Sequence, residues 1–334
     1  MLIIDGATVQ RLYSMDDAVA RVREAFRALG GDQVQQPLRK VLKMPGGRAF
    51  AVMPAQVSDP GGTATTAFGV KTITVTPDNP SRGLQVHNGL VLVFDPQTGV
   101  PAAAVEAGSL TAIRTAAASA VATDLLAPAG ADSLAVLGTG VQARAHIEAM
   151  AVVRPVRQVR VWGRHHERAK ALAAWAADHL GIEAAAYERI EEATLGAGIV
   201  CTTTASTEPL LFLDAVGPGT HINAVGASFP HARELDASLV ERASVFVDRR
   251  ESALNEAGDL LFPMREGRFK AEDIRGEIGE LLVGRCTGRT GPDEITVFES
   301  LGLAVQDVVS AMRVWERAEA EGAGVKVSLN PAAH

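Results

Sequence analysis

Apolar residues follow three different rhythms along the chain, and the first rhythm is helical. After a short apolar run at Leu2–Ile4, which predicts a strand, apolar side chains recur every three or four residues as far as Gly30. This spacing places them on one face of an amphipathic helix, which Ser14 or Asp16 can cap and Gly30-Gly31 can end. The chain is therefore expected to begin with a strand and a helix.

Short apolar runs separated by Pro, Gly and Asp set the second rhythm, between Pro37 and Glu106. Runs of this kind predict strands joined by tight connections. The expected strands are 38–42, 48–53, 69–75, 90–94 and 100–105. Asp95-Pro96-Gln97-Thr98-Gly99 has the residue chemistry of a hairpin turn. This part of the chain is therefore expected to form a mainly antiparallel sheet.

From Ser133 onward, apolar runs alternate with helical segments, a rhythm typical of a parallel sheet with helices on both faces. An alanine-rich helix at 110–126 precedes this region and ends at Pro128-Ala129-Gly130. Beyond it we expect a helix at 166–180 and strands at 133–137, 159–162, 199–203, 221–225 and 244–247. The apolar residues from Phe298 to Trp315 predict a last helix, which is expected to return to the first domain.

These rhythms and the length of 334 residues predict two domains. One is an α+β domain with the antiparallel sheet, formed by residues 1–115 and 304–334. The other is a Rossmann-type α/β domain with a doubly wound parallel sheet, formed by residues 116–303. The predicted junction lies within the alanine-rich helix.

Composition and charge narrow the class of protein. A hydrophobic content of 47% and a charged content of 21% describe an ordinary globular protein, and the net charge of −7 argues against a general nucleic-acid partner. No apolar run approaches the ~18 residues of a membrane span, and the N-terminal residues lack the basic region of a signal peptide. Cys201 and Cys286 have neither metal-like nor disulfide-like spacing. We expect a cytoplasmic protein with no bound metal and no membrane partner.

The segment Gly138-Thr139-Gly140-Val141-Gln142-Ala143 is the first candidate for chemistry, because it joins an expected strand to a helix-compatible stretch at 142–150. Gly138 permits a tight turn, and Gly140 lets the backbone approach a pyrophosphate at the helix N-terminus. Ala143 stands at the third glycine position of a dinucleotide fingerprint. Glycine-rich turns precede many helices, so this signal is weak alone. It predicts a dinucleotide site with residues 138–142 as cofactor contacts.

The second strand of the parallel sheet ends at Val161-Trp162-Gly163-Arg164-His165. An NAD site usually carries an acidic residue there, which binds the ribose 2′-hydroxyl. No carboxylate stands at this place, and Arg164 can pair with a 2′-phosphate. NADPH is therefore favoured over NADH, with Arg164 and His165 as cofactor contacts. A solvated basic edge is the alternative, since other cations are close in sequence: Arg154, Arg157, Arg160, Arg168 and Lys170.

Arg39, Lys71 and Arg114 stand in apolar or extended settings of the first domain. A guanidinium binds a carboxylate through two parallel hydrogen bonds, and a lysine adds a compact point charge. Three such cations would hold a small carboxylate substrate if they converge, whereas surface or ion-paired cations are the alternative. His87 is expected to be structural, and His231 is a weak candidate acid.

Threonines stand at the end of the strand expected at 199–203, where an open α/β sheet binds its ligand. Thr202, Thr203 and Thr204 are candidate contacts of the cofactor ribose or phosphate. Ordinary strand-end threonines are the alternative reading.

Seven segments, in order and spacing, resemble the ornithine cyclodeaminase/mu-crystallin family over essentially the whole chain. They are Gln36-Pro37-Leu38-Arg39, Val52-Met53-Pro54-Ala55, Gly69-Val70-Lys71, Ile113-Arg114-Thr115-Ala116-Ala117, Gly138–Ala143, Val225-Gly226-Ala227-Ser228 and Glu299-Ser300-Leu301-Gly302. The resemblance implies a homodimer paired through the sheets of its first domains, and a Rossmann domain that holds a nicotinamide cofactor. It also implies that the three cations bind the substrate carboxylate beside Met53. The cofactor contacts that it adds are Thr115, Val225, Ser228, Ser300 and Leu301.

Two departures from the cyclodeaminase pattern favour a reductase similar to mu-crystallin. Ser228 stands at the position where the cyclodeaminase pattern has an aspartate, which acts on the substrate amine. Ala51 stands at the position where cyclodeaminases tend to have a glutamate. We therefore expect hydride transfer from NADPH to Δ1-pyrroline-2-carboxylate or Δ1-piperideine-2-carboxylate, with Lys71 or a water held by Ser228 at the imine nitrogen. The alternatives are an ornithine cyclodeaminase, an amino-acid or N-alkyl amino-acid dehydrogenase, and a non-catalytic NADP-dependent binding protein.

Overall fold

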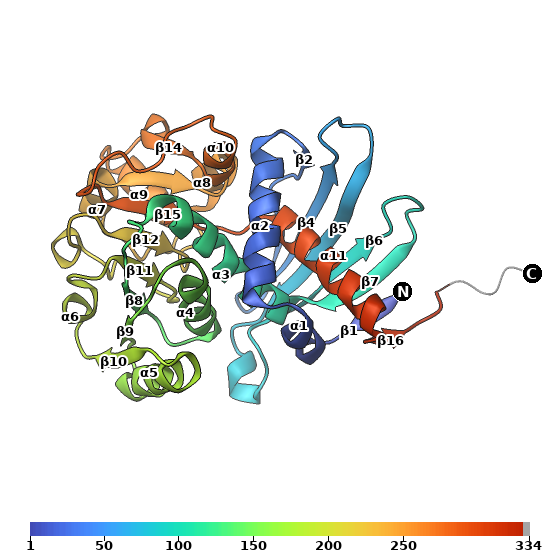
Figure 1. Cartoon of the computed structure of the whole chain (residues 1–334), viewed down its shortest axis with the longest axis horizontal. Helices are drawn as coiled ribbons and strands as arrows, with labels where there is room; N and C mark the ends of the chain where they lie inside the picture. Colours follow the sequence, from blue (N-terminus) through green and yellow to red (C-terminus); the bar gives the residue numbers. More distant parts are fainter. Residues whose placement is uncertain (330–334) are drawn as a thin grey trace, which may run out of the picture. The chain divides into compact units, whose positions relative to one another are not determined.

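The computed structural model describes residues 1–329. The described chain divides into two compact units, which we call unit 1 and unit 2 (Figure 1). Unit 1 consists of residues 1–114 and the segment from Leu303 onward, and unit 2 consists of residues 115–302. The chain passes from unit 1 to unit 2 within helix α3 (Ala107–Leu126). It returns to unit 1 just after strand β15 (Thr296–Glu299).

Unit 1 is built on a sheet with the strand order β16-β1-β7-β6-β5-β4-β2, and β3 also pairs with β4. Neighbouring strands are antiparallel except β1 and β7, which are parallel, so the expectation of a mainly antiparallel sheet is confirmed. The Asp95 carboxylate accepts hydrogen bonds from the backbone of Gln97 and Thr98 and so fixes the turn between β6 and β7. The strands are β1 (Leu2–Ile4), β2 (Val34–Gln35), β3 (Lys40–Met44), β4 (Arg48–Ser58), β5 (Thr65–Val75), β6 (His87–Phe94), β7 (Pro101–Glu106) and β16 (Val325–Lys326).

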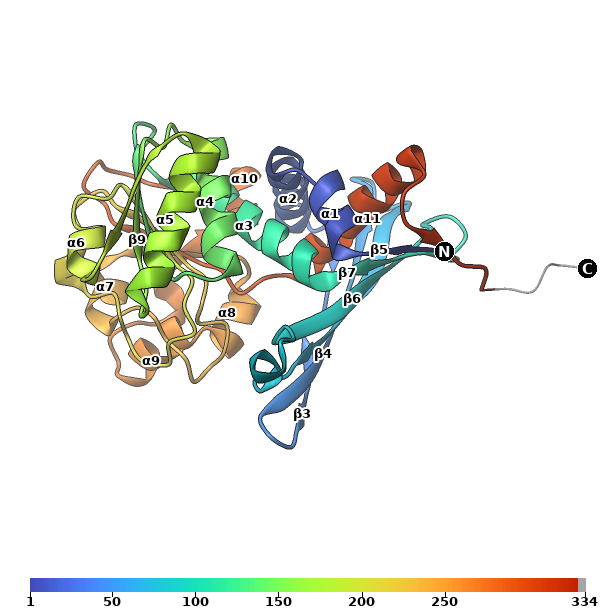
Figure 2. The same ribbon diagram turned by 90° about the horizontal axis from the view of Figure 1, so that it is seen from below.

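Three helices of unit 1 lie on one face of this sheet, namely α1 (Gly6–Leu12), α2 (Met15–Gly30) and α11 (Ala304–Glu321) (Figure 2). Ser14 caps α2 by accepting a hydrogen bond from the backbone of Asp17, and Gly31 follows its last residue. Along β4, buried residues alternate with half-buried ones, because every second side chain faces the helices. No helix of the described part of unit 1 covers the opposite face.

Unit 2 is built on a parallel sheet of eight strands with the order β10-β9-β8-β11-β12-β15-β13-β14. The chain moves from β8 to β10 in one direction and continues from β11 in the other. A switch point therefore lies between β8 and β11, where ligands bind in sheets of this kind. The expected doubly wound sheet is confirmed. Its strands are β8 (Ser133–Leu137), β9 (Gln158–Trp162), β10 (Glu183–Tyr187), β11 (Ile199–Thr202), β12 (His221–Ala224), β13 (Ser244–Val247), β14 (Ile274–Glu277) and β15.

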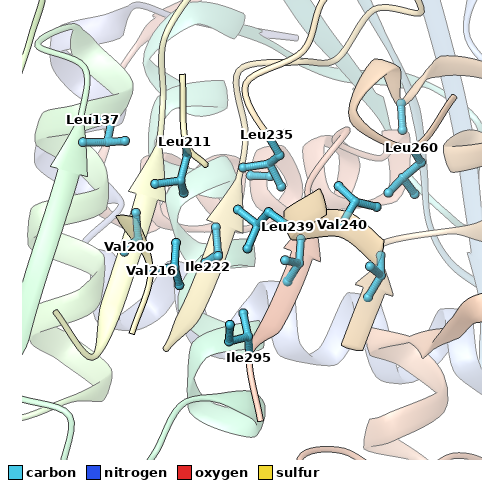
Figure 3. Close-up of a cluster of buried hydrophobic side chains, with 14 of the residues drawn as sticks. Leu137, Val200, Leu211, Val216, Ile222, Leu235, Leu239, Val240, Leu260 and Ile295 are labelled. Carbon is cyan, nitrogen blue, oxygen red and sulfur yellow. The ribbon is translucent and has the colours of Figure 1, made fainter. Parts of the chain in front are cut away.

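Helices cover both faces of the sheet of unit 2, with α4 and α5 on one side and α7 and α9 on the other (Figure 2). The side chains between the sheet and the second group of helices form an apolar core that includes Leu137, Ile222 and Leu239 (Figure 3). Burying each such side chain contributes about 1.5–3 kcal/mol. The helices of this unit are α4 (Val141–Val153), α5 (His166–Leu180), α6 (Ile190–Thr194), α7 (Ala237–Arg242), α8 (Arg250–Glu256), α9 (Gly258–Arg265) and α10 (Ile278–Leu282).

The structure corrects the expected start of the last helix. Phe298 lies in strand β15, in the middle of the parallel sheet, and the helix begins at Ala304. Only four residues separate this strand from the helix, and the apolar residues of both form one unbroken series. Periodicity alone therefore assigns the strand and the helix to a single element. Strands β10 and β14 and helix α1 are also absent from the sequence-based prediction, because their short segments carry little periodic signal.

Candidate functional site

The glycine turn of unit 2 lies at the switch point of the parallel sheet. Gly138 follows β8 with φ of +130°, and its N–H donates to the carbonyl of Trp162 at the end of β9. A Cβ on Gly138 would lie 2.5 Å from Oγ1 and 2.8 Å from the carbonyl oxygen of Thr203, which follows β11. Both the backbone angle and this close approach require glycine. The turn therefore brings the ends of β8, β9 and β11 together.

Helix α4 begins directly after this turn, and its N-terminus is suited to an anion. Gly140 is the N-cap residue and supplies no side-chain cap, and the first turn contains no acidic residue. A Cβ on Gly140 would meet nothing within 4 Å, so the space above the helix end is open. Free N–H groups and the helix dipole favour a phosphate at such a position. The residues present therefore fit the pyrophosphate of a dinucleotide.

The remaining residues of the turn support its shape. Thr139 packs against Gly163, where a Cβ would lie 2.4 Å from the Thr139 methyl carbon. Ala143 is fully buried, as close packing of the helix on the sheet requires. Val141 is exposed, and the Oε1 atom of Gln142 is buried without a hydrogen-bond partner in the described chain.

The end of β9 carries Arg164 and His165, and both side chains are exposed. No hydrogen bond or ion pair joins Arg164 to another residue of the described chain. Arg154, which the sequence groups with it, is instead buried and binds backbone carbonyls of Thr123, Asp124 and Ala127, so it fastens the end of α3. Lys170 pairs with Glu167 at 2.9 Å. Arg164 is thus a free cation at the position that discriminates between dinucleotides.

A buried glutamate, Glu234, ties the ends of β11 and β12 together. Its carboxylate accepts hydrogen bonds from Thr202 Oγ1 at 2.6 Å, from the Thr204 backbone at 2.6 Å and from the Gly226 backbone at 2.7 Å. The Thr202 hydroxyl therefore donates its hydrogen bond within the protein, to Glu234. Val225, next to Gly226, donates its N–H to the Thr202 carbonyl. The loop that begins here carries the half-buried Ser228.

A second buried carboxylate, Asp248, holds the segment after β15. One of its oxygens accepts hydrogen bonds from the backbone of Leu301 at 2.9 Å and of Gly302 at 2.7 Å. The N–H of Ser300 donates to the carbonyl of Ala224, at the end of β12, over 2.8 Å. The Ser300 hydroxyl is buried and has no hydrogen-bond partner within the described chain. Ser300 and Leu301 are thus fixed beside the end of β12.

Two further buried carboxyl groups, Asp259 and Glu299, lie near these two. Burial raises the pKa of Asp259 to about 8, and the charge of Glu234 adds to this effect. Burial also raises the pKa of Glu299 well above its ordinary value, together with the charges of Asp259, Asp248 and Glu234. Both carboxyl groups therefore ionise less readily than exposed ones.

Unit 1 contains a separate cluster of charged side chains beneath α11. Lys71 on β5 is 3% exposed, and its Nζ atom lies 2.8 Å from Oδ2 of Asp307 on α11. Arg114 on α3 is 4% exposed, and its Nε atom lies 2.8 Å from Oδ1 of the same carboxylate. Met53 on β4 pairs directly with Lys71 in the sheet. The charge of the half-buried Arg39 also acts on Lys71.

Lys71 and Arg114 thus meet at the carboxylate of Asp307, and the charge of Arg39 reaches the same lysine. Burial lowers the pKa of Lys71 to about 8, Asp307 opposes this change, and Arg114 and Arg39 add to it. Burial alone would raise the pKa of Asp307, but Arg114 and Lys71 hold it below its ordinary value. The two buried cations Lys71 and Arg114 share the single negative charge of Asp307, and this surplus of positive charge suits an anionic ligand.

The other predicted residues lie outside the two groups of carboxylates. Thr115 is buried in α3. His87 begins β6, and burial together with the Lys71 charge lowers its pKa. His231 is exposed and lies against the Phe229 ring. Cys201 is fully buried, and burial raises the pKa of its thiol to about 12.

The sequence analysis missed the carboxylates that organise both sites, namely Asp307 in unit 1 and Glu234, Asp248, Asp259 and Glu299 in unit 2. The available signal was an acidic residue at an apolar run. Asp307 lies inside such a run, Asp248 directly follows strand β13, and Glu299 is the last residue of strand β15.

The fold and the glycine turn define a dinucleotide-binding protein of the Rossmann class, and unit 1 contains a buried cluster in which Asp307 pairs with Lys71 and Arg114. The model of the ornithine cyclodeaminase/mu-crystallin family matches residues 2–322. The chain belongs to this family.

Three relatives illustrate the relationship. A Δ1-pyrroline-2-carboxylate reductase of Bacillus cereus is 37% identical over 330 residues, which are 98% of this chain and 100% of the relative. The ketimine reductase mu-crystallin of Mus musculus is 39% identical over 284 residues, 85% of each chain. The structure of Thermococcus litoralis Δ1-pyrroline-2-carboxylate reductase with NADH and L-proline matches with a TM-score of 0.93 at 34% identity, covering 98% of this chain and 100% of that one.

These relationships confirm the expected class, an NAD(P)H-dependent oxidoreductase that acts on carbon–nitrogen bonds. A nicotinamide cofactor agrees with the residues of the glycine turn and of α4. None of the helices in the described residues is both long and apolar enough to cross a membrane.

Proposed function

We propose that this enzyme reduces a cyclic α-imino acid with NADPH, converting Δ1-pyrroline-2-carboxylate to proline or Δ1-piperideine-2-carboxylate to pipecolate. The pair of buried cations Lys71 and Arg114 around the one carboxylate of Asp307 carries the proposal, because its surplus positive charge suits a substrate carboxylate. The charge of Arg39 also acts on Lys71. The Bacillus cereus and Thermococcus litoralis relatives are named for the five-membered substrate, which supports this assignment.

In this proposal the bound nicotinamide supplies the hydride, and the residues of the chain position the imine and balance its charge. The cations Arg39 and Arg114 hold the carboxylate of the imino acid. The imine carbon accepts the hydride and its nitrogen accepts one proton, so that C=N becomes CH–NH. Lys71 is the proton donor, since its pKa of about 8 leaves it protonated but weakly acidic at neutral pH. A water held by Ser228 is the alternative donor.

The choice of NADPH rests on Arg164. Its exposed guanidinium is free of partners in the described chain and stands where a ribose 2′-phosphate is recognised. The absence of a carboxylate in Gly163-Arg164-His165-His166 removes the usual partner of the ribose 2′-hydroxyl. The Thermococcus litoralis relative holds NADH, so the proposed preference for NADPH rests on the residues of this chain alone.

We also propose that the enzyme is a homodimer that pairs through the helix-free face of the unit 1 sheet. That face exposes apolar side chains on its strands, including Leu42 at 64% and Leu90 at 42% of their surface. The stacked rings of Phe68 and Phe94 lie on the same face. An exposed apolar face of this kind marks an interaction surface.

Both cysteines are free thiols, which supports a cytoplasmic location.

One set of assays tests the proposed function. Purified enzyme is mixed with NADPH or NADH and either cyclic imino acid, and cofactor oxidation is followed together with the appearance of proline or pipecolate. Parallel reactions contain pyruvate with an amine, or ornithine. We expect rapid oxidation of NADPH only with a cyclic imino acid. Release of ammonia from ornithine without net oxidation of NADPH would identify a cyclodeaminase and overturn the proposal.

A further inference from the structure

Asp307 is the anion of the unit 1 cluster, and it touches both of the buried cations. It lies in the first turns of α11, is fully buried, and places one oxygen 2.8 Å from Lys71 Nζ and the other 2.8 Å from Arg114 Nε. A single carboxylate thereby joins β5, α3 and α11. The neighbouring Gln306 accepts from Arg114 Nη1 at 3.0 Å and from the Leu303 backbone at 3.2 Å, which fixes the same helical turn.

These contacts use only part of the hydrogen-bonding capacity of the two cations. The guanidinium of Arg114 is held through Nε and Nη1, and no residue of the described chain accepts a hydrogen bond from its Nη2 atom. Lys71 has three N–H donors, and Asp307 is its one ion-pair partner among the described residues. Donors on both side chains therefore stay available to a ligand while Asp307 fixes their direction.

We propose that Asp307 is a positioning residue, which orients Arg114 toward the substrate carboxylate and keeps Lys71 in its protonated form for the reaction. This inference rests on the proposed function, because it assigns Asp307 a role in binding and protonating a cyclic imino acid. Asp307 itself touches neither substrate nor cofactor in this proposal; it acts through the two cations that it contacts.

The balance of charge around Lys71 gives the inference its measurable consequence. Asp307 faces Lys71 from α11, Arg114 faces it from α3, Arg39 lies before β3, and the charge of Lys71 reaches His87 on β6. Only Asp307 raises the pKa of Lys71 in this set. Without it, burial and two guanidinium groups act unopposed, and Lys71 loses its proton at a lower pH.

The test is the Asp307→Asn variant, which keeps the shape of the side chain and removes its charge. We expect the alkaline limb of the kcat/KM profile for the cyclic imino acid to move from near pH 8 to lower pH by about one unit or more. At neutral pH, KM for the imino acid should rise by roughly tenfold. The Kd for NADPH should change less than about twofold, because the dinucleotide residues belong to unit 2. The Asp307→Glu variant should restore the wild-type pH limb in part.

A matched control separates this role from a structural one. Asp17 also pairs with cations of α11, at 2.9 Å from Arg313 and 3.2 Å from Arg317, but it lies outside the cluster. Asp17→Asn should therefore lower thermal stability and leave the pH profile unchanged. A fall in activity of Asp307→Asn at every pH, without a shift of the limb, would overturn the inference.

A second readout does not depend on turnover. In protein labelled with ¹³C at lysine Cε, the NMR titration of Lys71, assigned with Lys71→Arg, reports its pKa directly. We expect a midpoint near 8 in the wild type and a lower midpoint in Asp307→Asn. Equal midpoints would refute the role of Asp307. If the wild type reduces neither imino acid, the proposed function fails, whereas a shifted midpoint would still establish the effect of Asp307 on Lys71.

Discussion

The guanidinium of Arg164 is exposed at the end of β9 and is bound to no other residue of the described chain. Because a charge-assisted hydrogen bond contributes about 1.5–3 kcal/mol, Arg164→Asp should weaken NADPH binding by roughly 10- to 100-fold. NADH has no 2′-phosphate, so its Kd should change less than about threefold. Titration calorimetry with both cofactors measures the two values.

Arg168→Asp is the matched control for this change. Arg168 is another exposed cation, in the first turn of α5, and its replacement alters the net charge of the protein by the same amount. We expect it to leave the ratio of NADPH to NADH affinity nearly unchanged. Equal weakening of both cofactors by Arg164→Asp would remove Arg164 from the role of discriminator.

At the residue scale, sequence reasoning found the cations of the site but not the carboxylates that organise them. Arg39, Lys71 and Arg114 were predictable because each stands in an apolar or extended segment. Asp307 was not, since it is 193 residues from Arg114 along the chain and only the fold brings the two together. Spacing in a sequence reports neighbours on one element, whereas an ion pair between α3 and α11 depends on tertiary packing.

At the scale of one element, Gly138 and Gly140 of the dinucleotide turn have different roles. Replacing each by alanine can separate these roles. Gly138→Ala places a methyl group within 2.5 Å of Thr203 at a φ of +130°, so it should destabilise unit 2 by about 1–3 kcal/mol. Gly140→Ala meets nothing within 4 Å and should leave the melting temperature nearly unchanged. Its methyl group enters the space expected for the pyrophosphate and should raise the Kd for NADPH by at least about tenfold.

Calorimetric scans and NADPH titrations of both variants decide this prediction. Tight NADPH binding by Gly140→Ala would show that the end of α4 is not the phosphate site. A melting temperature of Gly138→Ala equal to that of the wild type would show that Thr203 yields to the added methyl group.

Elements were predictable where one periodicity runs for many residues, and not where two meet. The helices at 15–30 and 166–180 were found because each keeps a helical spacing and ends at glycine. Strand β15 was taken into the last helix, because Phe298, Leu301 and Val305 read as one apolar series. The segment between strand and helix is held by the carboxylate of Asp248, which follows β13 and accepts hydrogen bonds from the backbone N–H groups of Leu301 and Gly302.

At the scale of the whole molecule, two kinds of buried ionisable group set the pH range in which the fold is stable. Buried histidines lower the free energy of unfolding at acid pH, and buried carboxyl groups lower it at alkaline pH. Burial lowers the pKa of His146 to about 4 and of His221 to about 3. The unfolded state binds more protons than the folded state below about pH 6.5, so these histidines destabilise the fold as pH falls. Asp259 and Glu299 act in the opposite direction, because burial raises the pKa of both carboxyl groups in the folded state.

The contribution of Glu299 can be isolated with Glu299→Gln, which keeps the volume of the side chain and cannot ionise. A carboxyl group with a raised folded-state pKa stabilises the fold fully below its unfolded-state pKa, near 4.5, and loses that contribution as pH rises through the folded-state pKa. The variant should therefore melt near the wild-type temperature at pH 4.5 and above it at pH 9, by roughly 3–8 °C.

The exposed Glu241 provides the comparison, since it pairs with Arg268 at 2.7 Å on the surface of the same unit. Glu241→Gln should change the melting temperature by a similar small amount at both pH values, because its pair is screened by solvent. If Glu299→Gln gives the same difference at pH 4.5 and pH 9, Glu299 is charged in the folded protein at both.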